Sequence, residues 1–383
     1  MKSIGIICEY NPFHNGHLYH LNKIKEMYKD YQIILVMSGN FTERGNVSII
    51  DKWQKTEIAL KAGIDLVIEL PFFFASQSAD TFARGAIEIL HELKVEAIVF
   101  GSESNDINKL IEIAKITTNN KKYDKLVKNY LDDGYNYPTA LSNALFDLTG
   151  KRILKSNDIL GISYIKEIIK LNSNIKPICI KRTNDFNDTT LYDNVTSSTS
   201  IRNALKNKEE ITNQVPEFVK PYLNSVHFID DYYHLIKYKI LSEKNNLKNY
   251  QTVDEGIENR ILKYIINTSN LDELIFKVKT KRYTYNKINR LLIHILTGFT
   301  KEEANSFDHI EYIRVLGFNN NGRTYLNSIK KDITVPIITS VNSIKNKMLD
   351  LEFRTTCCYA SILEYNESIK LIEKEYKNSL IIY

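Results

Sequence analysis

Two histidines stand three residues apart near the start of the chain, with a glycine between them. His14, Gly16 and His17 follow the apolar run 3–8 and lead into a stretch with helical periodicity. The start of a helix offers unpaired backbone N–H groups and a partial positive charge, and the imidazoles add donors. Gly16 lets a base or phosphate approach the backbone closely. The arrangement predicts a nucleotide phosphate site, and the alternative is that the histidines only cap the helix.

A second group of phosphate-binding residue types occurs far downstream. Ser197 to Ser200 precede Arg202 and open another helix-like stretch. Hydroxyls and N–H groups there can cap the helix and bind phosphate oxygens, and the Arg202 guanidinium can bridge β- and γ-phosphates in bidentate fashion. An ordinary Ser/Thr cap is the alternative. Neither a G-x-x-x-x-G-K-[ST] loop nor a G-x-G-x-x-G fingerprint occurs, which argues against P-loop and common dinucleotide folds.

Apolar runs and helix-like stretches alternate along the first half of the chain. The runs lack polar alternation, so they predict strands covered on both faces, in a parallel sheet with right-handed crossovers. The expected strands are 3–8, 32–37, 65–70, 96–100 and 175–180, and the expected helices are 18–28, 52–62, 79–93 and 159–171. Ligands of such sheets bind beyond the carboxyl ends of strands. We therefore expect the loops at 14–17, 38–40 and 101–102 to converge.

The remaining organisation predicts two domains in a chain of 383 residues. A mainly helical insert occupies about 106–146, and strand signals fade after Arg202, so we place a domain boundary near residue 210, before a helix-rich part over 211–383. No apolar run is long enough to span a bilayer, and no export signal is visible, which predicts a cytoplasmic protein. Four cysteines without a C-x-x-C pair predict neither zinc nor a disulfide framework.

The net charge of +5 permits an anionic partner, and one segment concentrates the positive charge. Residues 276–290 carry six cationic side chains and no acid, with tyrosines interleaved, and so combine phosphate contacts with stacking faces. The alternative is a solvated face. The candidate nucleic-acid contacts are Lys277, Lys279, Lys281, Arg282, Tyr283, Lys287 and Arg290.

The His14 to His17 motif resembles the HxGH motif of the nucleotidylyltransferase superfamily, and 197–202 resembles that superfamily's phosphate motif. The chain as a whole resembles the bacterial tRNA(Met) cytidine acetate ligase family. The segments that carry this resemblance are 9–17, 37–41 with 44–45, 69–71, 100–103, 156–160, 255–260, 281–284 and 315–318. Small-molecule adenylyltransferases usually have Ser or Thr where this chain has Glu9, and Asp where it has Asn11, which favours the ligase family.

The resemblance implies an HUP-type α/β catalytic domain over 1–210 and a helical tRNA-binding domain over 211–383. It implies that ATP, with Mg²⁺, and acetate form acetyl-adenylate, which then acetylates the wobble cytidine N4 of elongator tRNA(Met). We expect catalysis by His14, His17 and Lys23, although Lys23 could instead be a solvated helix lysine. The implied ATP contacts are Ile7, Tyr10, Asn11, Pro12, Phe13, His14, Asn15, Gly16, His17, His20, Gly101, Asn157, Arg182, Ser198, Thr199 and Arg202.

Several alternatives stay open at this point. Asn157 could be a helix N-cap, and Arg182 could be an exposed charge at a strand end. The protein could instead transfer AMP to a small-molecule acceptor, or it could be a non-catalytic RNA-binding protein gated by ATP. No carboxylate cluster indicates a protein site for the metal, and the base that takes the amine proton is not apparent.

Overall fold

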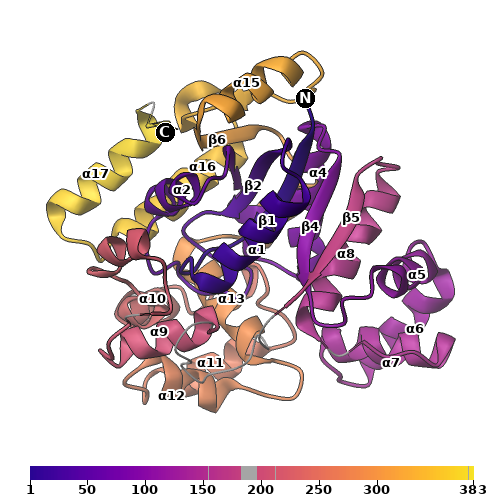
Figure 1. Cartoon of the computed structure of the whole chain (residues 1–383). Coiled ribbons are helices and arrows are strands. Elements are labelled where there is room, and N and C mark those ends of the chain that lie inside the picture. Colours follow the sequence, from indigo (N-terminus) through magenta and orange to yellow (C-terminus); the bar gives the residue numbers. More distant parts are fainter. Residues whose placement is uncertain (154, 183–195, 212, 378) are drawn as a thin grey trace.

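A mixed sheet of eight strands forms the centre of the computed structural model, which describes residues 1–153, 155–182, 196–211, 213–377 and 379–383 (Figure 1). The strand order is β5-β4-β1-β2-β3-β6-β7, and β8 pairs with β6. The strands are β1 (Ser3–Cys8), β2 (Gln32–Ser38), β3 (Leu66–Leu70), β4 (Ala97–Ser102), β5 (Lys176–Lys181), β6 (Ile313–Phe318), β7 (Ile337–Ile338) and β8 (Ile381–Ile382).

The first five strands are parallel, as the alternating pattern predicted. β1 lies between β2 and β4, with Ser3 opposite Gln32 and Ile4 opposite Ala97. Each predicted strand agrees with its observed bounds to within two residues. The carboxyl ends of β1 and β4 therefore meet at one edge of the sheet.

The helices that follow these strands are also close to their predicted positions. α1 ends at Met27, and the insert consists of three helices, α5 to α7, with Gly134 in the left-handed region between the last two. The helices of the first half are α1 (Asn15–Met27), α2 (Lys52–Lys61), α3 (Phe72–Ala75), α4 (Ala79–Glu92), α5 (Ile107–Thr117), α6 (Lys121–Asp132), α7 (Tyr137–Thr149) and α8 (Ser156–Lys170).

Helices also make up most of the rest of the chain, as predicted. The α-helices are α9 (Ser198–Lys206), α10 (Tyr233–Ser242), α11 (Ile257–Ile265), α12 (Leu271–Val278), α13 (Tyr285–Thr297), α14 (Lys301–Ser306), α15 (Asn320–Ile329), α16 (Lys347–Ala360) and α17 (Tyr365–Tyr376). Short 3-10 helices are η1 (Glu217–Leu223), η2 (Ile229–Tyr232), η3 (Leu247–Asn249) and η4 (Val341–Ser343). None of the helices within the described ranges is long and apolar enough to cross a lipid bilayer.

The last third of the chain returns to the sheet, which the sequence interpretation missed. β6 pairs antiparallel with β3, with Leu66 opposite Phe318, and both β7 and β8 pair with β6. Helix α2, from the N-terminal part, packs against β6 (Figure 1). The domain boundary near residue 210 stays a prediction.

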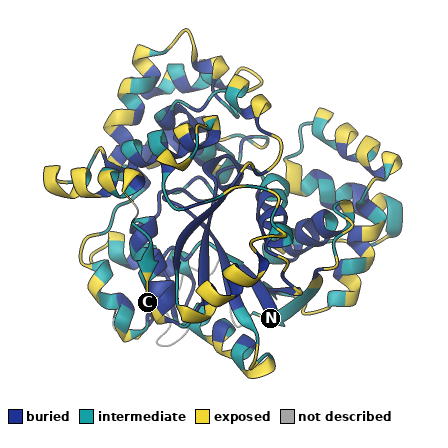
Figure 2. Ribbon diagram, turned by 90° about the horizontal axis from the view of Figure 1, so that it is seen from above, coloured by how far each residue is buried: buried dark blue, intermediate teal, exposed yellow. Residues whose placement is uncertain are grey.

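Burial explains why the strand sequences lack polar alternation. Every residue of β3 is buried, and the central strands are dark blue while the outward helix surfaces are yellow in Figure 2. Gly161 of α8 lies against β4, where an added Cβ would be 2.4 Å from the Phe100 ring. A glycine is therefore needed for α8 to approach the sheet this closely.

We expect acid to destabilise the fold partly through His294. This imidazole is completely buried on α13, 3.0 Å from the Ser76 carbonyl oxygen and 3.1 Å from that of Gln251. Burial lowers its pKa from 6.5 to about 4, so below about pH 6.5 the unfolded chain binds a proton that the folded chain does not. The free energy of unfolding therefore falls as pH drops from about 6.5 to 4, by roughly 3 kcal/mol from this group.

Urea unfolding at several pH values measures this contribution. The His294→Asn variant cannot bind the proton, so its free energy of unfolding should depend less steeply on pH over that range. Equal pH dependence of the two proteins would contradict the assignment.

Candidate active site

A cavity of about 750 Å³ opens beyond the carboxyl ends of β1 and β4. Its wall is built from the carboxyl ends of β1, β4 and β5, from the loops after β1, β2 and β5, from the starts of α1, α4, α8, α9 and α13, and from the insert. Most of the expected ATP contacts line it: Ile7, Tyr10, Asn11, His14, Gly16, His17, His20, Gly101, Asn157, Arg182, Ser198 and Arg202. This is the edge of the sheet at which parallel-sheet proteins bind ligands.

His14 and His17 cap α1 and face the cavity at the same time. His14 is the N-cap residue, and its Nδ1 accepts a hydrogen bond from Gly16 N–H at 3.0 Å. His17 Nδ1 accepts from His14 N–H at 3.3 Å, and the two rings stack with centroids 3.8 Å apart. Because both Nδ1 atoms accept, each neutral ring carries its proton on Nε2. The two histidines thus do cap α1, and the cap leaves the Nε2–H donor of each ring unused; that these donors bind a nucleotide stays a prediction.

The histidines of this wall are neutral at pH 7. Burial, with the nearby Arg182 and Arg202, lowers the pKa of His14 to about 3. Burial and Arg182 lower the pKa of His20 to about 4, and burial, followed by His14, holds the pKa of His17 well below its usual value. The wall therefore donates hydrogen bonds from neutral rings, and its positive charge comes from arginine and lysine side chains rather than from imidazolium groups.

The downstream serine motif lies against the upstream histidine motif. Arg202 Nη1 donates to the Asn11 carbonyl oxygen at 2.7 Å, although 191 positions separate the two residues. Arg202 Nη2 donates to Thr199 Oγ1 at 3.1 Å, and Ser198 Oγ to the Pro12 carbonyl oxygen at 3.5 Å. Pro12 and Thr199 thus orient residues of the wall. The N-terminus of α9 is brought beside that of α1, as a phosphate site shared by the two motifs would require.

The loop after β4 carries a support that the sequence interpretation missed. Asn157 lies in the first turn of α8, whose N-cap residue is Lys155, so the alternative of Asn157 as N-cap was wrong. Glu103 Oε1 accepts from Asn157 Nδ2 at 2.6 Å, and Glu103 Oε2 accepts from Asp158 N–H at 3.0 Å. This carboxylate therefore holds the Asn157 amide in place at the cavity.

Some predicted site residues lie outside the cavity wall. The Phe13 side chain is buried in the hydrophobic core, and Asn15 Nδ2 donates to the Asn213 carbonyl oxygen at 2.6 Å. Lys23 Nζ pairs with Glu26 at 2.7 Å on a partly exposed face of α1. The structure does not bring Lys23 to the two histidines, and its catalytic role stays a prediction.

The loop after β2 differs from the expectation. Residues 38–40 do not line the cavity: Ser38 and Asn40 are buried, and the carbonyl oxygens of Ser38 and Gly39 each accept from Lys55 Nζ at 2.7 Å. The cavity residues of this loop come a few positions later and are Thr42, Glu43, Arg44 and Asn46. The resemblance included Arg44, but no local pattern indicated that these residues would line the cavity.

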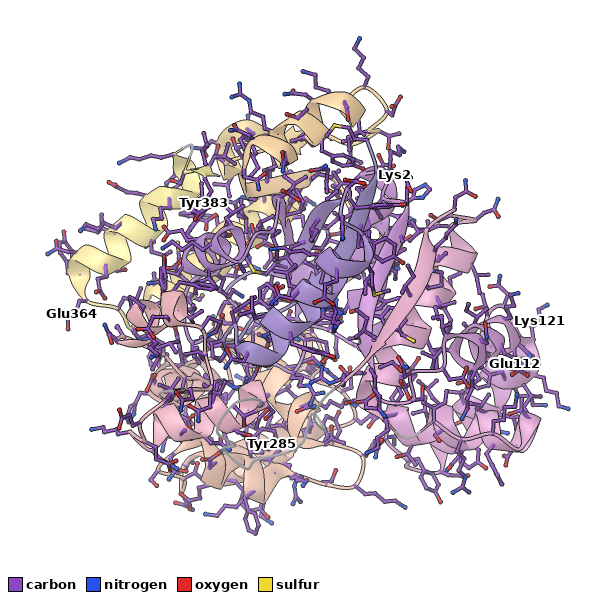
Figure 3. All side chains as sticks on the ribbon, in the orientation of Figure 1. Lys2, Glu112, Lys121, Tyr285, Glu364 and Tyr383 are labelled. Atoms are coloured by element: carbon purple, nitrogen blue, oxygen red, sulfur yellow. The ribbon has the colours of Figure 1, made fainter. Side chains whose placement is uncertain are left out.

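The basic segment divides into cavity residues and surface residues. Arg282, Lys287 and Arg290 line the cavity, whereas Lys279 and Lys281 are exposed. Tyr283 is buried, with its ring 4.1 Å from Lys287 Nζ, so it supports the segment from beneath. Lys277 pairs with Glu273 at 2.6 Å. Figure 3 labels Tyr285 on this side of the molecule, far from Lys2 and Tyr383.

The helical insert, whose role the sequence did not indicate, supplies another part of the wall. Tyr135 and Tyr137 line the cavity, and the Tyr137 hydroxyl donates to Asp80 Oδ2 at 2.6 Å. Lys281 Nζ lies 4.3 Å from the centroid of the Tyr135 ring. The insert and the basic segment therefore meet at the edge of the cavity, whose outer part combines cations with aromatic rings.

Known proteins resemble this chain over its full length. A family model described as HIGH Nucleotidyl Transferase matches residues 1–375. The tRNA(Met) cytidine acetate ligase of Clostridium acetobutylicum is 39% identical, with 100% of both chains covered, and that of Caldicellulosiruptor saccharolyticus is 41% identical, with 98% of both covered. The crystal structure of Thermotoga maritima TmcAL bound with alpha-thio ATP superposes with a TM-score of 0.90 at 32% identity over 100% of both chains.

Proposed function

The chain belongs to the tRNA(Met) cytidine acetate ligase family of HIGH nucleotidyl transferases, and from this we propose that it uses ATP to acetylate a cytidine of methionine tRNA. The observation that carries the proposal is the meeting of two distant phosphate-binding motifs. Arg202 reaches the loop before His14, beside two Nε2–H donors. Such a wall suits a triphosphate, since donors and a guanidinium converge on it.

We propose that ATP lies along the wall formed by the loop after β1 and the starts of α8 and α9. The proposed contacts are Ile7, Tyr10, Asn11, His14, Gly16, His17, His20, Gly101, Asn157, Arg182, Ser198 and Arg202, with Pro12, Phe13, Asn15 and Thr199 as supports. The buried imidazoles donate Nε2–H bonds to phosphate oxygens. The negative charge of the triphosphate raises the pKa values of these imidazoles.

The first step needs positioning more than acid–base chemistry. Acetate is ionised at neutral pH, so its oxygen attacks the α-phosphate without a general base, and pyrophosphate leaves with the P–O electron pair. His14 and His17 stabilise the charge on the five-coordinate phosphorus in this proposal. Lys23 can join them only if its side chain leaves Glu26.

Mg²⁺ enters the proposal as an ion bound by the triphosphate oxygens. Within the described ranges, no three His, Cys, Asp or Glu side chains are grouped so that they could hold a metal ion. We therefore assign it no protein ligand and no step of the reaction.

The second step brings the tRNA to the outer part of the cavity. The N4 amine of the wobble cytidine attacks the acetyl carbonyl carbon and AMP leaves, which requires the base to be splayed out of the anticodon loop. The candidate tRNA contacts are Lys277, Lys279, Lys281, Arg282, Lys287 and Arg290, with Tyr283 supporting them. We assign tRNA binding to 211–383, catalysis to 1–210, and both activities to the cytoplasm.

ATP–pyrophosphate exchange tests the function directly. The proposed ligase exchanges pyrophosphate only with acetate present, a small-molecule adenylyltransferase needs another acceptor, and an ATP-gated binding protein exchanges none. Mass spectrometry of tRNA nucleosides from a deletion strain should show loss of N4-acetylcytidine. Exchange without acetate, or an unchanged nucleoside, contradicts the proposal.

Reversing the charge of Lys281 and Arg282 should weaken tRNA binding. Lys281 is exposed and Arg282 lies at the cavity edge, where it pairs with Glu255 at 2.9 Å. In the Lys281→Glu/Arg282→Glu variant we expect about a tenfold or larger loss of tRNA affinity. The slope of log affinity against log salt concentration should also become shallower, by about two, because two phosphate contacts are lost. Filter binding at several salt concentrations measures both quantities.

The matched control is Lys331→Glu, which changes an exposed lysine that follows α15 in the sequence. In Figure 1, α15 lies near the top of the molecule and α12 near the bottom. The tRNA affinity of this control should stay within about threefold of the unchanged protein, since a single distant surface charge is largely screened. Unchanged affinity in the double variant would reject the basic segment as a tRNA contact.

A further inference from the structure

The cavity wall contains four acidic side chains among the residues that the structure describes, and they differ in their partners. Three have side-chain partners: Glu43 with Arg290 at 2.9 Å, Glu255 with Arg282 at 2.9 Å, and Asp80 with Tyr137 at 2.6 Å and Ser163 at 2.8 Å. Within the described ranges, the Glu9 carboxylate has no ion pair and no hydrogen bond to another side chain, and it accepts only from the backbone N–H of Glu43. Its carboxylate is therefore the one available to a ligand.

Glu9 is held by the backbone alone. It directly follows β1, and its Oε1 accepts from Glu43 N–H at 2.7 Å. This bond fixes the carboxylate while leaving Oε2 without a partner in the described part of the chain. Burial raises the pKa of Glu9. Glu9 interacts electrostatically with the charged or titratable groups of Glu43, Arg44, Lys55, Arg202, Cys8 and Tyr164.

The position of Glu9 lies between the phosphate wall and the basic segment. On one side, Arg202 holds the carbonyl oxygen of Asn11, two residues after Glu9. On the other side, Glu43 both donates its N–H to Glu9 and pairs with Arg290. The loop after β2 packs closely against α13 there, since a Cβ added to Gly45 would lie 2.2 Å from the backbone nitrogen of Arg290. Glu9 thus lies between the proposed ATP wall and the proposed tRNA-binding segment.

We infer that the Glu9 carboxylate binds the exocyclic amine of the target cytidine and accepts its proton during acyl transfer, an inference that rests on the proposed function. A carboxylate is the side-chain group that accepts a hydrogen bond from cytosine N4. Uracil has a carbonyl oxygen at that position, and its lone pairs would repel the carboxylate instead of donating a hydrogen bond to it. Glu9 therefore selects a pyrimidine with an amine as well as removing its proton.

The step balances in atoms and charge. The N4 lone pair forms a bond to the acetyl carbonyl carbon, and the bond from that carbon to the phosphate oxygen breaks, with its electron pair leaving on AMP. One amine proton passes to Glu9 and the other remains on the amide nitrogen. Glu9 then returns its proton to water, so no further reactant is needed.

A two-stage assay with Glu9→Gln tests the inference. Glutamine keeps the size of the side chain and an oxygen that can accept from Glu43 N–H, but it cannot take a proton. We expect single-turnover transfer from preformed acetyl-adenylate to tRNA to fall by about a hundredfold or more, as loss of a general base predicts. Acetate-dependent ATP–pyrophosphate exchange, which also reports folding, should fall far less, by about threefold at most.

Asp80→Asn is the matched control, because it neutralises another carboxylate of the same wall whose two oxygens already have partners. Its transfer rate should exceed that of Glu9→Gln by about tenfold or more. Transfer by Glu9→Gln within threefold of the unchanged protein, or equal losses in transfer and exchange, would overturn the inference. Absence of acetate-dependent exchange in the unchanged protein would instead refute the proposed function, so the two failures are distinguishable.

Discussion

His17→Ala should slow acetyl-adenylate formation by roughly a hundredfold or more. The variant loses an Nε2–H donor of the cavity wall, and removal of one well-aimed donor raises a reaction barrier by about 2.7–4 kcal/mol. The same imidazole also accepts the His14 N–H, so the variant loses part of a helix cap, which costs about 0.5–2 kcal/mol of stability. Acetate-dependent pyrophosphate exchange measures the first loss, and thermal unfolding measures the second.

Two further substitutions separate these losses. His17→Asn can keep an acceptor near the Nδ1 position, so it should retain the cap but not the activity. His17→Gln places an amide nitrogen near the Nε2 position, so it should recover part of the rate. Exchange at the unchanged rate in His17→Ala would show that the histidine serves the helix alone.

Lys23 shows what the sequence motif could and could not indicate about α1. His20 lies three positions after His17 and thus about 300° around the helix, so it returns to the cavity side, whereas Lys23 lies about 240° from His17. The structure agrees, since His20 lines the cavity and Lys23 pairs with Glu26. Helical phase, rather than proximity to the motif, was the useful signal.

The elements that could be predicted are those whose pattern reflects local burial. Strands covered on both faces are continuously apolar, and β3 is buried along its whole length. The place of Arg202 in the cavity wall was predictable for a different reason, because hydroxyls before an arginine at a helix start are typical of a phosphate site. These signals depend only on residues that are close together in the sequence.

The parts that could not be predicted depend on contacts between distant segments. Arg44 reaches the cavity because its loop packs against α13, where Gly45 approaches the Arg290 backbone. Tyr135 takes part in the wall because the insert folds back to meet Lys281. The pairing of β6 with β3 likewise joins residues that no local pattern connects.

The buried charges beside β3 and β6 should control the stability of the fold. Arg314 is completely buried and pairs with Glu69 Oε2 at 3.0 Å and with Glu375 Oε2 at 2.7 Å. Lys52 pairs with the other oxygens of the same two carboxylates, at 2.8 and 2.7 Å. Burial alone would raise the pKa of Glu375, but the charges of Arg314 and Lys52 lower it to about 2. Burial, and to a smaller extent the charge of Glu69, raises the pKa of Glu352 to about 8. In this buried group two cationic side chains, Arg314 and Lys52, thus face the two carboxylates of Glu69 and Glu375.

Arg314→Met should lower the free energy of unfolding by about 3–5 kcal/mol, because it leaves two buried carboxylates with a single cation. Arg354→Met is the matched control, since Arg354 also makes two bonds to one partner, Glu303, at 2.9 and 3.0 Å, but its side chain is 39% exposed. Water screens that pair, so the control should lose no more than about 1 kcal/mol. Adding Glu375→Gln to Arg314→Met restores equal charge in the core and should recover part of the loss. Equal losses in the two methionine variants by urea unfolding at pH 7 would mean that the buried cluster contributes no more than a surface pair.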